Sequence, residues 1–435
     1  IYSYKTDGDE ALTSVKTYNI AGVEESGWLA DSIERLTSVT VYEGAKNKET
    51  MRYTLSYYMY DSAQDTYLPW ERKDYTYEKD AIRIIETYDI SGLTVDQTTV
   101  RGAGALVEKE FLRGQKGYEK TTYKLALYDS EGNPNLREDY SYFGKRLTKT
   151  ETYDISAVSS YDEKLVNKDV LQEESIYEGR AGDEKVVRTT GYYPNHSILN
   201  ETIYTYATTI IYRRYVLHIT AKTFSEEGAL LDRIETSNTS ADLNGNILTQ
   251  NVRTYYVSDG VEKLEMEEET RYSNYIGLGD AGRQVTTTFF VTNYVDDTNY
   301  TREEAGYTEI QNFKFGPRHN VLEQRIDTYG DHTKAEFLWT QDIYNYKTDF
   351  YGNIIDRSET TWWDVGRTGP LTYKVIHNEY DNLLARRKGN ATHSTVNIYS
   401  SRTTLDLTTL MEKQEIYNNP DTIDARGNIV DQTID

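Results

Sequence analysis

Two short acidic stretches have the spacing of a calcium-binding loop. Residues 242–246 read DLNGN and residues 129–133 read DSEGN, so each stretch carries oxygen-bearing side chains on alternate residues. The candidate ligands are Asp242, Asn244 and Asn246 in the first and Asp129, Glu131 and Asn133 in the second. Neither stretch continues to the distal bidentate glutamate of a helix-loop-helix calcium site. The simpler interpretation is a turn held by Asx hydrogen bonds, with a weak calcium site as the alternative. No other cofactor is expected.

The remaining residues with chemical potential form no recognisable catalytic pattern. The six histidines are scattered without a pair at zinc-binding spacing, and there is no cysteine. Gly277, Gly279 and Gly282 match the dinucleotide fingerprint by letter. The fingerprint requires a following helix, whereas RQVTTTFFV is typical of a strand. There is no G-x-S-x-G elbow. We therefore expect a protein that is not an enzyme, with an unrecognised activity as the remote alternative.

Charge and hydropathy exclude several classes of partner. The formal net charge of −23 disfavours nucleic acid and anionic membrane surfaces, since both require a basic surface. No apolar run approaches the roughly 18 residues of a membrane span. Ile1 is neither an initiator methionine nor part of a signal-peptide pattern, so we expect a mature or excised piece of a longer polypeptide.

The elements that position these residues are predicted to be strands in a tandem repeat. A Tyr-x-Tyr pair, with weaker copies at Tyr272 and Tyr417, recurs at intervals of 64 to 73 residues. The full pairs are Tyr2 and Tyr4, Tyr75 and Tyr77, Tyr140 and Tyr142, Tyr204 and Tyr206, and Tyr344 and Tyr346. A period of roughly 69 residues predicts about six modules. Their expected boundaries are 1–74, 75–139, 140–203, 204–271, 272–343 and 344–416, with the start of a further module at 417–435.

A second series of markers has the same period. It consists of Tyr18, Tyr88, Tyr153, Phe224, Tyr294 and Trp362. Gly44, Gly114 and Gly179 each follow one of the first three of these by 26 residues, so three copies keep their register without an insertion. Two independent markers that agree on one period make an accident of composition a poor explanation.

Each module has the texture of strands joined by tight turns. Stretches rich in Thr, Tyr, Ile and Val alternate polar and apolar residues, as half-buried strands do. The alternation breaks at turn glycines, which are Gly22, Gly92, Gly132, Gly228, Gly245, Gly352 and Gly427. At this spacing one module holds roughly four to six strands. Residues 262–272 could form a helix by propensity, but their neighbours favour a strand.

Tyrosine is the compositional outlier, with 41 residues against 9 phenylalanines. Tyrosine forms strands well and buries its ring while its hydroxyl stays hydrated or hydrogen-bonded. Exposed rings, with Trp362 and Trp363 as the strongest pair, could stack on sugars. The alternative that we favour is a structural ladder, because Tyr-x-Tyr puts both rings on one face of a strand. In that ladder the rings stack from module to module.

The turn phrases resemble a known repeat. Residues 88–93 read YDISGL and residues 128–133 read YDSEGN. Both resemble the tyrosine-aspartate (YD, or Rhs-type) repeat of large surface and secreted proteins. That family usually has arginine after the glycine, where this chain mostly has Asn, Leu or Val. The resemblance implies long β-hairpins wound side by side into a spiral sheet or shell, usually extracellular, with no active site in the repeats.

We therefore predict an all-β chain built as a tandem β-hairpin repeat array: a spiral sheet, β-solenoid or shell. The expected function is that of a structural protein forming a filament, stalk or shell, extracellular or at the cell surface. Both ends read as ordinary repeat sequence, which favours continuation in a longer chain or end-to-end self-association. The alternative function is a glycan- or surface-binding adhesin that uses exposed aromatic residues.

Overall fold

The structure is a computed structural model. It describes residues 2–5, 11–18, 36–61, 66–90, 93, 95–128, 131–158, 160–164, 168–207, 215–242, 245–258, 260–276, 279–315, 320–348, 352–369, 371–381, 389–419 and 431–434. By their contacts the residues divide into two compact units. Unit 1 comprises residues 1–140, 153–169 and 349–353, and unit 2 comprises residues 141–152, 170–348 and 354–435.

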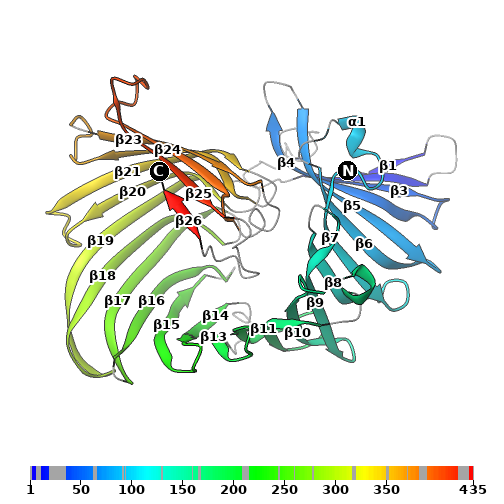
Figure 1. The fold of residues 1–435 in the computed structure, drawn as a ribbon, viewed down its shortest axis with the longest axis horizontal. Helices are drawn as coiled ribbons and strands as arrows, with labels where there is room; N and C mark the ends of the chain where they lie inside the picture. The colour runs from blue at the N-terminus through cyan, green and yellow to red at the C-terminus, as the bar shows by residue number, and fades with distance from the viewer. Residues whose placement is uncertain are drawn as a thin grey trace. The chain divides into compact units, whose positions relative to one another are not determined.

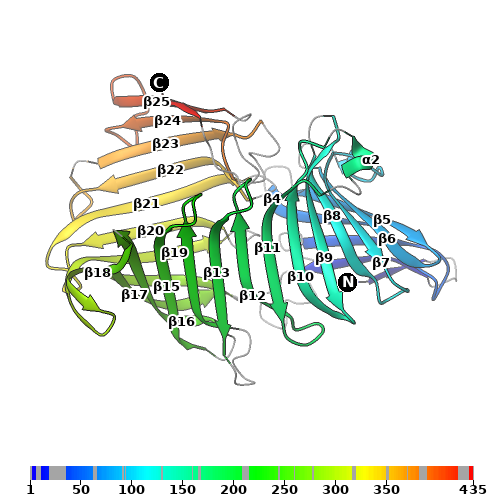
Figure 2. The ribbon, with the colours of Figure 1, turned by 60° about the horizontal axis from the view of Figure 1, so that its bottom comes forward.

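The described residues form strands with two four-residue helices (Figures 1 and 2). The first part of the chain contains β1 (Tyr2–Tyr4), β2 (Leu12–Tyr18), β3 (Leu36–Glu43), β4 (Thr50–Asp61), β5 (Thr66–Glu78), β6 (Ala81–Asp89), α1 (Val95–Thr98), β7 (Ala105–Arg113), β8 (Lys120–Tyr128), β9 (Pro134–Phe143), β10 (Arg146–Asp154) and α2 (Tyr161–Lys164). It continues with β11 (Val170–Glu178), β12 (Lys185–Tyr192), β13 (Ile198–Tyr206), β14 (Val216–Phe224), β15 (Leu230–Ala241), β16 (Ile247–Ser258), β17 (Val261–Ile276), β18 (Asp280–Asp296) and β19 (Asn299–Phe315). The last strands are β20 (Val321–Tyr329), β21 (Phe337–Thr348), β22 (Ile354–Trp362), β23 (Leu371–Glu379), β24 (His393–Tyr399), β25 (Leu410–Asn418) and β26 (Gln432–Ile434).

The strands follow one another in a single antiparallel sheet of 26 strands. Consecutive strands pair as hairpins, for example β5 with β6 and β23 with β24. The predicted all-β array of tandem hairpins is therefore confirmed. Residues 262–272, for which a helix was the alternative, lie in β17 and pair with β16 and β18.

The sequence period corresponds to four strands. The first tyrosine of each marker, including the two weak copies, lies on β1, β5, β9, β13, β17, β21 and β25. The second markers lie on β2, β6, β10, β14, β18 and β22. Successive markers are therefore separated by three intervening strands, or roughly 19 Å at the usual strand spacing. Rings that far apart do not stack, so the expected ladder from module to module does not form.

Turn glycines adopt backbone conformations that other residues rarely reach. Gly132, Gly228, Gly245 and Gly352 lie between paired strands with φ of 82°, 84°, 86° and 85°. Gly22, Gly92 and Gly427 lie outside the described residues. A different turn follows β3, where Gly44 has φ of 120° and an added Cβ would lie 2.8 Å from the Lys48 carbonyl oxygen. The equivalent turns after β7 and β11 contain Gly114 and Gly179, with φ of 130° and 125°.

A carboxylate bridge recurs across three of these hairpins. The carboxylate of Glu49 accepts a hydrogen bond from the Leu12 N–H at 3.0 Å. Glu119 does the same for Ile82 at 3.1 Å, and Glu184 for Leu147 at 2.9 Å, always with a separation of 37 residues. Each glutamate immediately precedes one strand and reaches the first or second residue of the strand two positions back, which is Leu12 in β2, Ile82 in β6 and Leu147 in β10. These contacts show that the repeat extends to individual side chains.

Unit 1 has a small apolar core with a buried ion pair beside it. Tyr53, Leu55 and Ile90 pack together, and Ile90 is completely buried. Arg72 lies on the Tyr53 ring, with its guanidinium carbon 4.0 Å from the ring centroid. It also binds Asp74 at 2.6 Å, where both side chains are 1% exposed. A second guanidinium donor of Arg72 reaches the carbonyl of Thr98 at the end of α1, so the pair holds this helix against the sheet.

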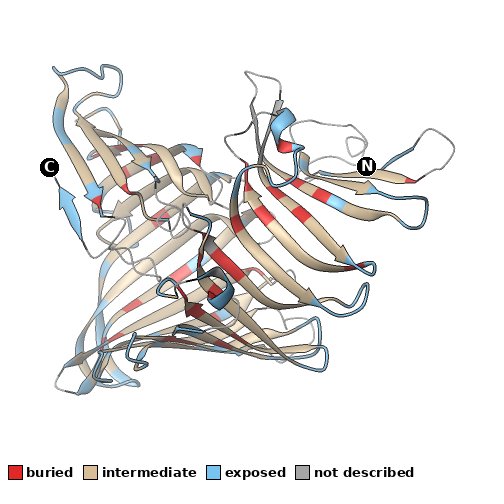
Figure 3. Cartoon of the chain, turned by 45° about the vertical axis from the view of Figure 1, so that its right-hand side comes forward, coloured by how far each residue is buried: buried red, intermediate tan, exposed pale blue. Residues whose placement is uncertain are grey.

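Most strand residues are only half-buried, and full exposure is concentrated at hairpin turns (Figure 3). Among the described residues, buried side chains are polar or charged more often than they are apolar. Hydroxyl pairs across strands, such as Thr40 with Thr54 at 3.0 Å and Thr270 with Thr286 at 2.9 Å, satisfy part of this polarity. Among the described residues, no helix has the length and apolar character needed to cross a membrane.

Candidate functional site

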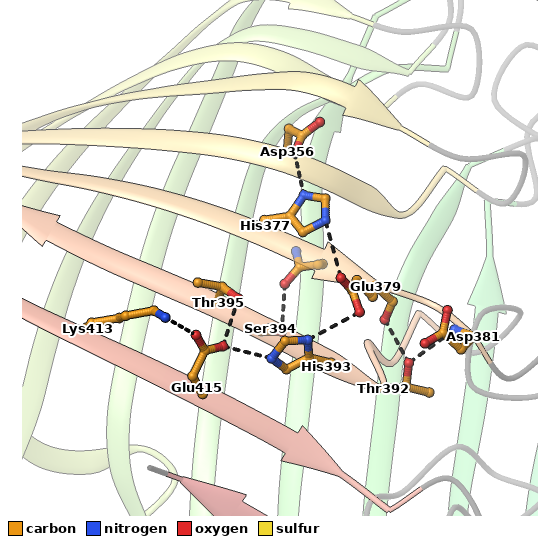
Figure 4. A network of polar contacts seen from close by, with 11 residues as sticks. Asp356, His377, Glu379, Asp381, Thr392, His393, Ser394, Thr395, Lys413 and Glu415 are labelled. Atoms are coloured by element: carbon orange, nitrogen blue, oxygen red, sulfur yellow. Dashed lines mark hydrogen bonds and ion pairs between the residues drawn. The ribbon is translucent and has the colours of Figure 1, made fainter. Parts of the chain in front are cut away.

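A cluster of titratable side chains in unit 2 lies on β22 to β25 (Figure 4). Strand register places it in two neighbouring rows. The first row contains Asp356, His377, Thr395 and Glu415, on β22, β23, β24 and β25. The second row contains Glu379, His393 and Tyr417, on β23, β24 and β25. Residues two apart on one strand share a face, so both rows point to the same side of the sheet. We call these two rows the histidine–carboxylate rows.

His393 lies at the centre of the rows and contacts a carboxylate on each side. Its Nδ1 is 3.2 Å from a Glu379 oxygen, and its Nε2 is 2.8 Å from a Glu415 oxygen. Its ring stacks on Tyr417, with centroids 4.5 Å apart and planes inclined by 8°. A cationic imidazolium suits this position, because it offers two N–H donors to the two carboxylates and a charged face to the aromatic ring.

The second histidine extends the alternation of imidazole and carboxylate groups. Nδ1 of His377 lies 2.7 Å from an Asp356 oxygen, and its Nε2 lies 3.7 Å from the other oxygen of Glu379. Glu379 is therefore placed between two imidazole rings. At the far end, Lys413 binds Glu415 at 2.6 Å, and the Thr395 hydroxyl donates to Glu415 at 2.8 Å.

The environment shifts the proton affinities of the central groups. Burial disfavours the charged form of His393, but its hydrogen bonds with Glu415 and Glu379 outweigh that effect and raise its pKa. Hydrogen bonds from Lys413, Thr395 and His393 lower the pKa of Glu415 to about 2. This environment favours a protonated His393 beside an ionised Glu415.

A cavity of about 740 Å³ adjoins the rows. It is lined by Glu379, Asp381, Thr392, His393, Tyr417, Asn418, Asn419, Asp431 and Thr433. The Asn418 amide is already engaged, since it donates to the Ala391 carbonyl at 2.6 Å and accepts from Gln432 at 2.8 Å. The chemistry that this arrangement supports is the binding and release of a proton at His393, between carboxylates on the neighbouring strands. Within the described part of the chain, no group of three acidic or histidine side chains is arranged to hold a metal ion.

Of the calcium candidates, those that the structure describes lie in turns. In the turn between β15 and β16, the Asp242 carboxylate accepts two hydrogen bonds from Asn246, each at 2.9 Å. The Asn246 amide oxygen accepts the Gly279 N–H at 2.9 Å. Glu131 and Asn133 lie between β8 and β9. Asp129 and Asn244 lie outside the described residues.

The marker tyrosines are dispersed over the sheet and do not converge on one site. Two of them bind a side chain on a neighbouring strand through the hydroxyl: Tyr75 contacts Thr54 at 3.2 Å, and Tyr346 contacts Ser358 at 2.7 Å. Tyr346 is nevertheless 61% exposed. Of the tryptophan pair, Trp362 is 7% exposed and Trp363 is 59% exposed, so the two rings do not form a joint platform.

Sequence reasoning missed the histidine–carboxylate rows. His377 and His393 are 16 positions apart, and the chain returns between them so that Glu379 faces His393. The available signal was the pattern HNE before the turn and HST after it, which places a histidine and a second polar residue on one face of each strand. That signal becomes visible only once the hairpin register is known.

No family model matches this sequence, and no curated protein matches it. Among solved structures, the chain is similar to a chain of the Tc holotoxin pore of Photorhabdus luminescens, with 10% sequence identity and a TM-score of 0.16. The alignment covers 100% of this chain and 27% of that chain, so this chain spans about a quarter of its length. A similarity of this size adds nothing to the fold described above.

Proposed function

We propose that this chain is a structural β-repeat scaffold: a non-catalytic filament, stalk or shell element at the cell surface or outside the cell. The observation that carries the proposal is the four-strand period, in which side-chain contacts recur together with the strands. The bridges from Glu49, Glu119 and Glu184 are one such series. A repeat whose modules contact their sequence neighbours distributes stability along the array, as extended structural proteins require.

Unit 2 has a second series of connecting contacts. Five asparagines near the ends of odd-numbered strands donate to a backbone carbonyl near the start of the preceding strand. They are Asn238 to Val216, Asn312 to Ala281, Asn345 to Val321, Asn378 to Ile354 and Asn418 to Ala391, at 2.6 to 2.9 Å. Each contact ties two consecutive strands together near one end of their pairing. Contacts that recur along the sheet favour a structural role for the whole array over a role centred on a single pocket.

The polarity of the sheet supports the same function. Half-buried strands rich in Thr and Tyr leave both faces hydrated, and a net charge of −23 opposes lateral aggregation of such faces. The sequence resemblance to YD-type repeats, whose members are usually extracellular, is the basis for the proposed location. Self-association end to end, or continuation in a longer chain, would give the extended form.

Electron microscopy of the full-length native protein, combined with sedimentation, tests the proposal. We expect extended particles, thin filaments or a hollow wall. A monodisperse, compact monomer would contradict it. Salt titration serves as a control, because charge repulsion between sheet faces is screened at high ionic strength while backbone pairing is retained.

The alternative function, a glycan- or surface-binding adhesin, is favoured by one observation: Trp363 exposes 59% of its surface on the turn after β22. Binding of the native protein to a glycan array, lost in Trp363→Ala and retained in Tyr118→Ala, would support it. Tyr118 is a suitable control because its ring is similarly exposed, at 65%, on a different turn.

A further inference from the structure

The histidine–carboxylate rows cross four consecutive strands with alternating carboxylate and imidazole groups. Asp356, His377, Glu379, His393 and Glu415 follow one another from β22 to β25, each within 4 Å of the next. We propose that His393 forms a pH-dependent link between the strands of this segment. In its imidazolium form it ties β23 to β25, and its deprotonation loosens the hairpin β24–β25. This inference goes beyond the proposed scaffold function and does not depend on it.

The hydrogen-bond inventory of the imidazole carries the argument. A neutral imidazole has one N–H donor and one acceptor nitrogen. Both ring nitrogens of His393 lie within hydrogen-bond distance of carboxylate oxygens, at 3.2 Å for Glu379 and 2.8 Å for Glu415. In the neutral form, one lone pair would therefore face a carboxylate oxygen. Only the protonated ring satisfies both contacts, so loss of the proton breaks one link between strands.

Charged and polar groups on the neighbouring elements favour the protonated form of His393. Those that face His393 are Glu379 on β23, Glu415 and Tyr417 on β25, Asp381 after β23 and Asp431 before β26, with His377 and Lys413 behind the two glutamates. The carboxylates outnumber the cations in this set. Because the side chain of His393 is only 22% exposed, solvent screens these charges incompletely.

The direction of the pH effect follows from the two central groups. His393 has a pKa raised above its ordinary value of 6.5, so its contribution is complete below pH 6.5 and is lost as the pH rises through the raised pKa. Glu415 has a pKa lowered from 4.5 to about 2, so its contribution is complete above pH 4.5 and is lost as the pH falls toward 2. The link is therefore complete between pH 4.5 and 6.5 and is lost as the pH rises through the raised pKa of His393.

Hydrogen exchange of the native protein between pH 5 and 9 tests the proposal, after correction for the intrinsic exchange rate at each pH. We expect the opening equilibrium of the β24 and β25 amides to rise by up to about tenfold for each pH unit between the ordinary and the raised pKa of His393. His393→Gln should remove this dependence, because glutamine does not titrate.

His332→Gln is the matched control. His332 contacts Glu304 at 2.6 Å and lies between β20 and β21, outside the rows. This variant should leave the pH dependence of β24 and β25 unchanged. Equal loss of pH dependence in both variants would overturn the proposal.

A direct titration decides the case even if His393→Gln fails to fold. Nitrogen NMR of the native protein should show His393 doubly protonated at pH 6.5, and Glu415→Gln should shift its titration to lower pH. A neutral His393 at pH 6 would overturn the proposal. So would exchange in β24 and β25 that does not vary with pH in the native chain.

Discussion

Glu119 and Ile82 are 37 residues apart in sequence, yet the Glu119 carboxylate accepts the Ile82 N–H at 3.1 Å. The contact spans two strands, from the start of β8 to the start of β6. Ile82 lies next to a register shift in the β5–β6 hairpin, at the pairing between Tyr77 and Ile82. The carboxylate therefore satisfies a donor at an irregular position in the strand ladder, as a bulge near a turn requires.

Removing this acceptor should weaken the hairpin that it supports. Glu119→Ala leaves the Ile82 N–H without its partner, and we expect a loss of about 1 kcal/mol in the free energy of unfolding. Hydrogen exchange should show faster exchange at Ile82. Glu303→Ala is the control, since Glu303 is an exposed strand glutamate. Unchanged protection of Ile82 would show that the contact has no energetic role.

Acid should loosen the same hairpins. The Leu12 N–H is the main cause of the lowered pKa of Glu49, and backbone N–H groups also lower the pKa of Glu184. A lowered pKa means that the stabilisation is complete above the ordinary value of 4.5 and is lost as the pH falls below it. The midpoint temperature of thermal unfolding should therefore fall more steeply between pH 6 and pH 3 for the native chain than for the double variant Glu49→Gln, Glu184→Gln. Parallel curves would contradict the prediction.

The buried ion pair of unit 1 should be sensitive to the loss of one partner. Arg72→Met removes the cation that pairs with the buried Asp74 carboxylate, which keeps the hydrogen bond from the Gly102 N–H at 2.9 Å. An uncompensated buried charge costs about 3–5 kcal/mol. Adding Asp74→Leu should recover most of that loss, since two apolar side chains replace the pair. Urea unfolding measures both, and a double variant no more stable than Arg72→Met would contradict the prediction.

The equivalent pair one module later provides a comparison. Arg137 binds Asp139 at 2.8 Å, with side chains 10% and 12% exposed. Asp139 also binds Lys168 at 2.7 Å. Because Asp139 keeps this second cation, Arg137→Met should cost less than Arg72→Met.

One position in the asparagine series can be improved. Gln250, Gln324 and Gln432 each stand opposite an asparagine and donate to its side-chain oxygen at 2.7 to 2.9 Å. Opposite Asn345 stands Arg357 instead, and the Asn345 Oδ1 and Arg357 Nε atoms are buried without a partner. Arg357→Gln should supply the missing donor, gaining about 1 kcal/mol against a smaller loss of the ion pair with Glu359. Thermal unfolding checks this prediction, which expects a higher midpoint temperature for Arg357→Gln than for the native chain.

The reciprocal change is the control for that prediction. Gln324→Arg should lower the midpoint, because it removes the donor that Asn312 now accepts from. If both variants shift the midpoint in the same direction, the amide pairing does not account for the stability of these strands.

The fold could be predicted from sequence patterns but the histidine–carboxylate rows could not, for a physical reason. Strand texture and the spacing of Tyr2, Tyr75 and Tyr140 reflect backbone preference and repetition, which are local properties of the chain. Contacts between strands depend on register, which a shift of one residue reverses. His393 is directed at Glu415 only because β24 and β25 pair with His393 opposite Tyr417.

The central claim is that the strands pair in sequence order within a four-strand repeat, and cysteine cross-linking tests it most directly. The chain has no cysteine, so introduced pairs report without background. Thr54 and Lys73 are opposite on β4 and β5, and Lys124 and Glu138 are opposite on β8 and β9. We predict that cysteine pairs at 54/73 and at 124/138 form disulfides in the folded protein, whereas the displaced pair 54/138 does not. Equal cross-linking of the displaced pair, or none at 54/73 and 124/138, would contradict the account.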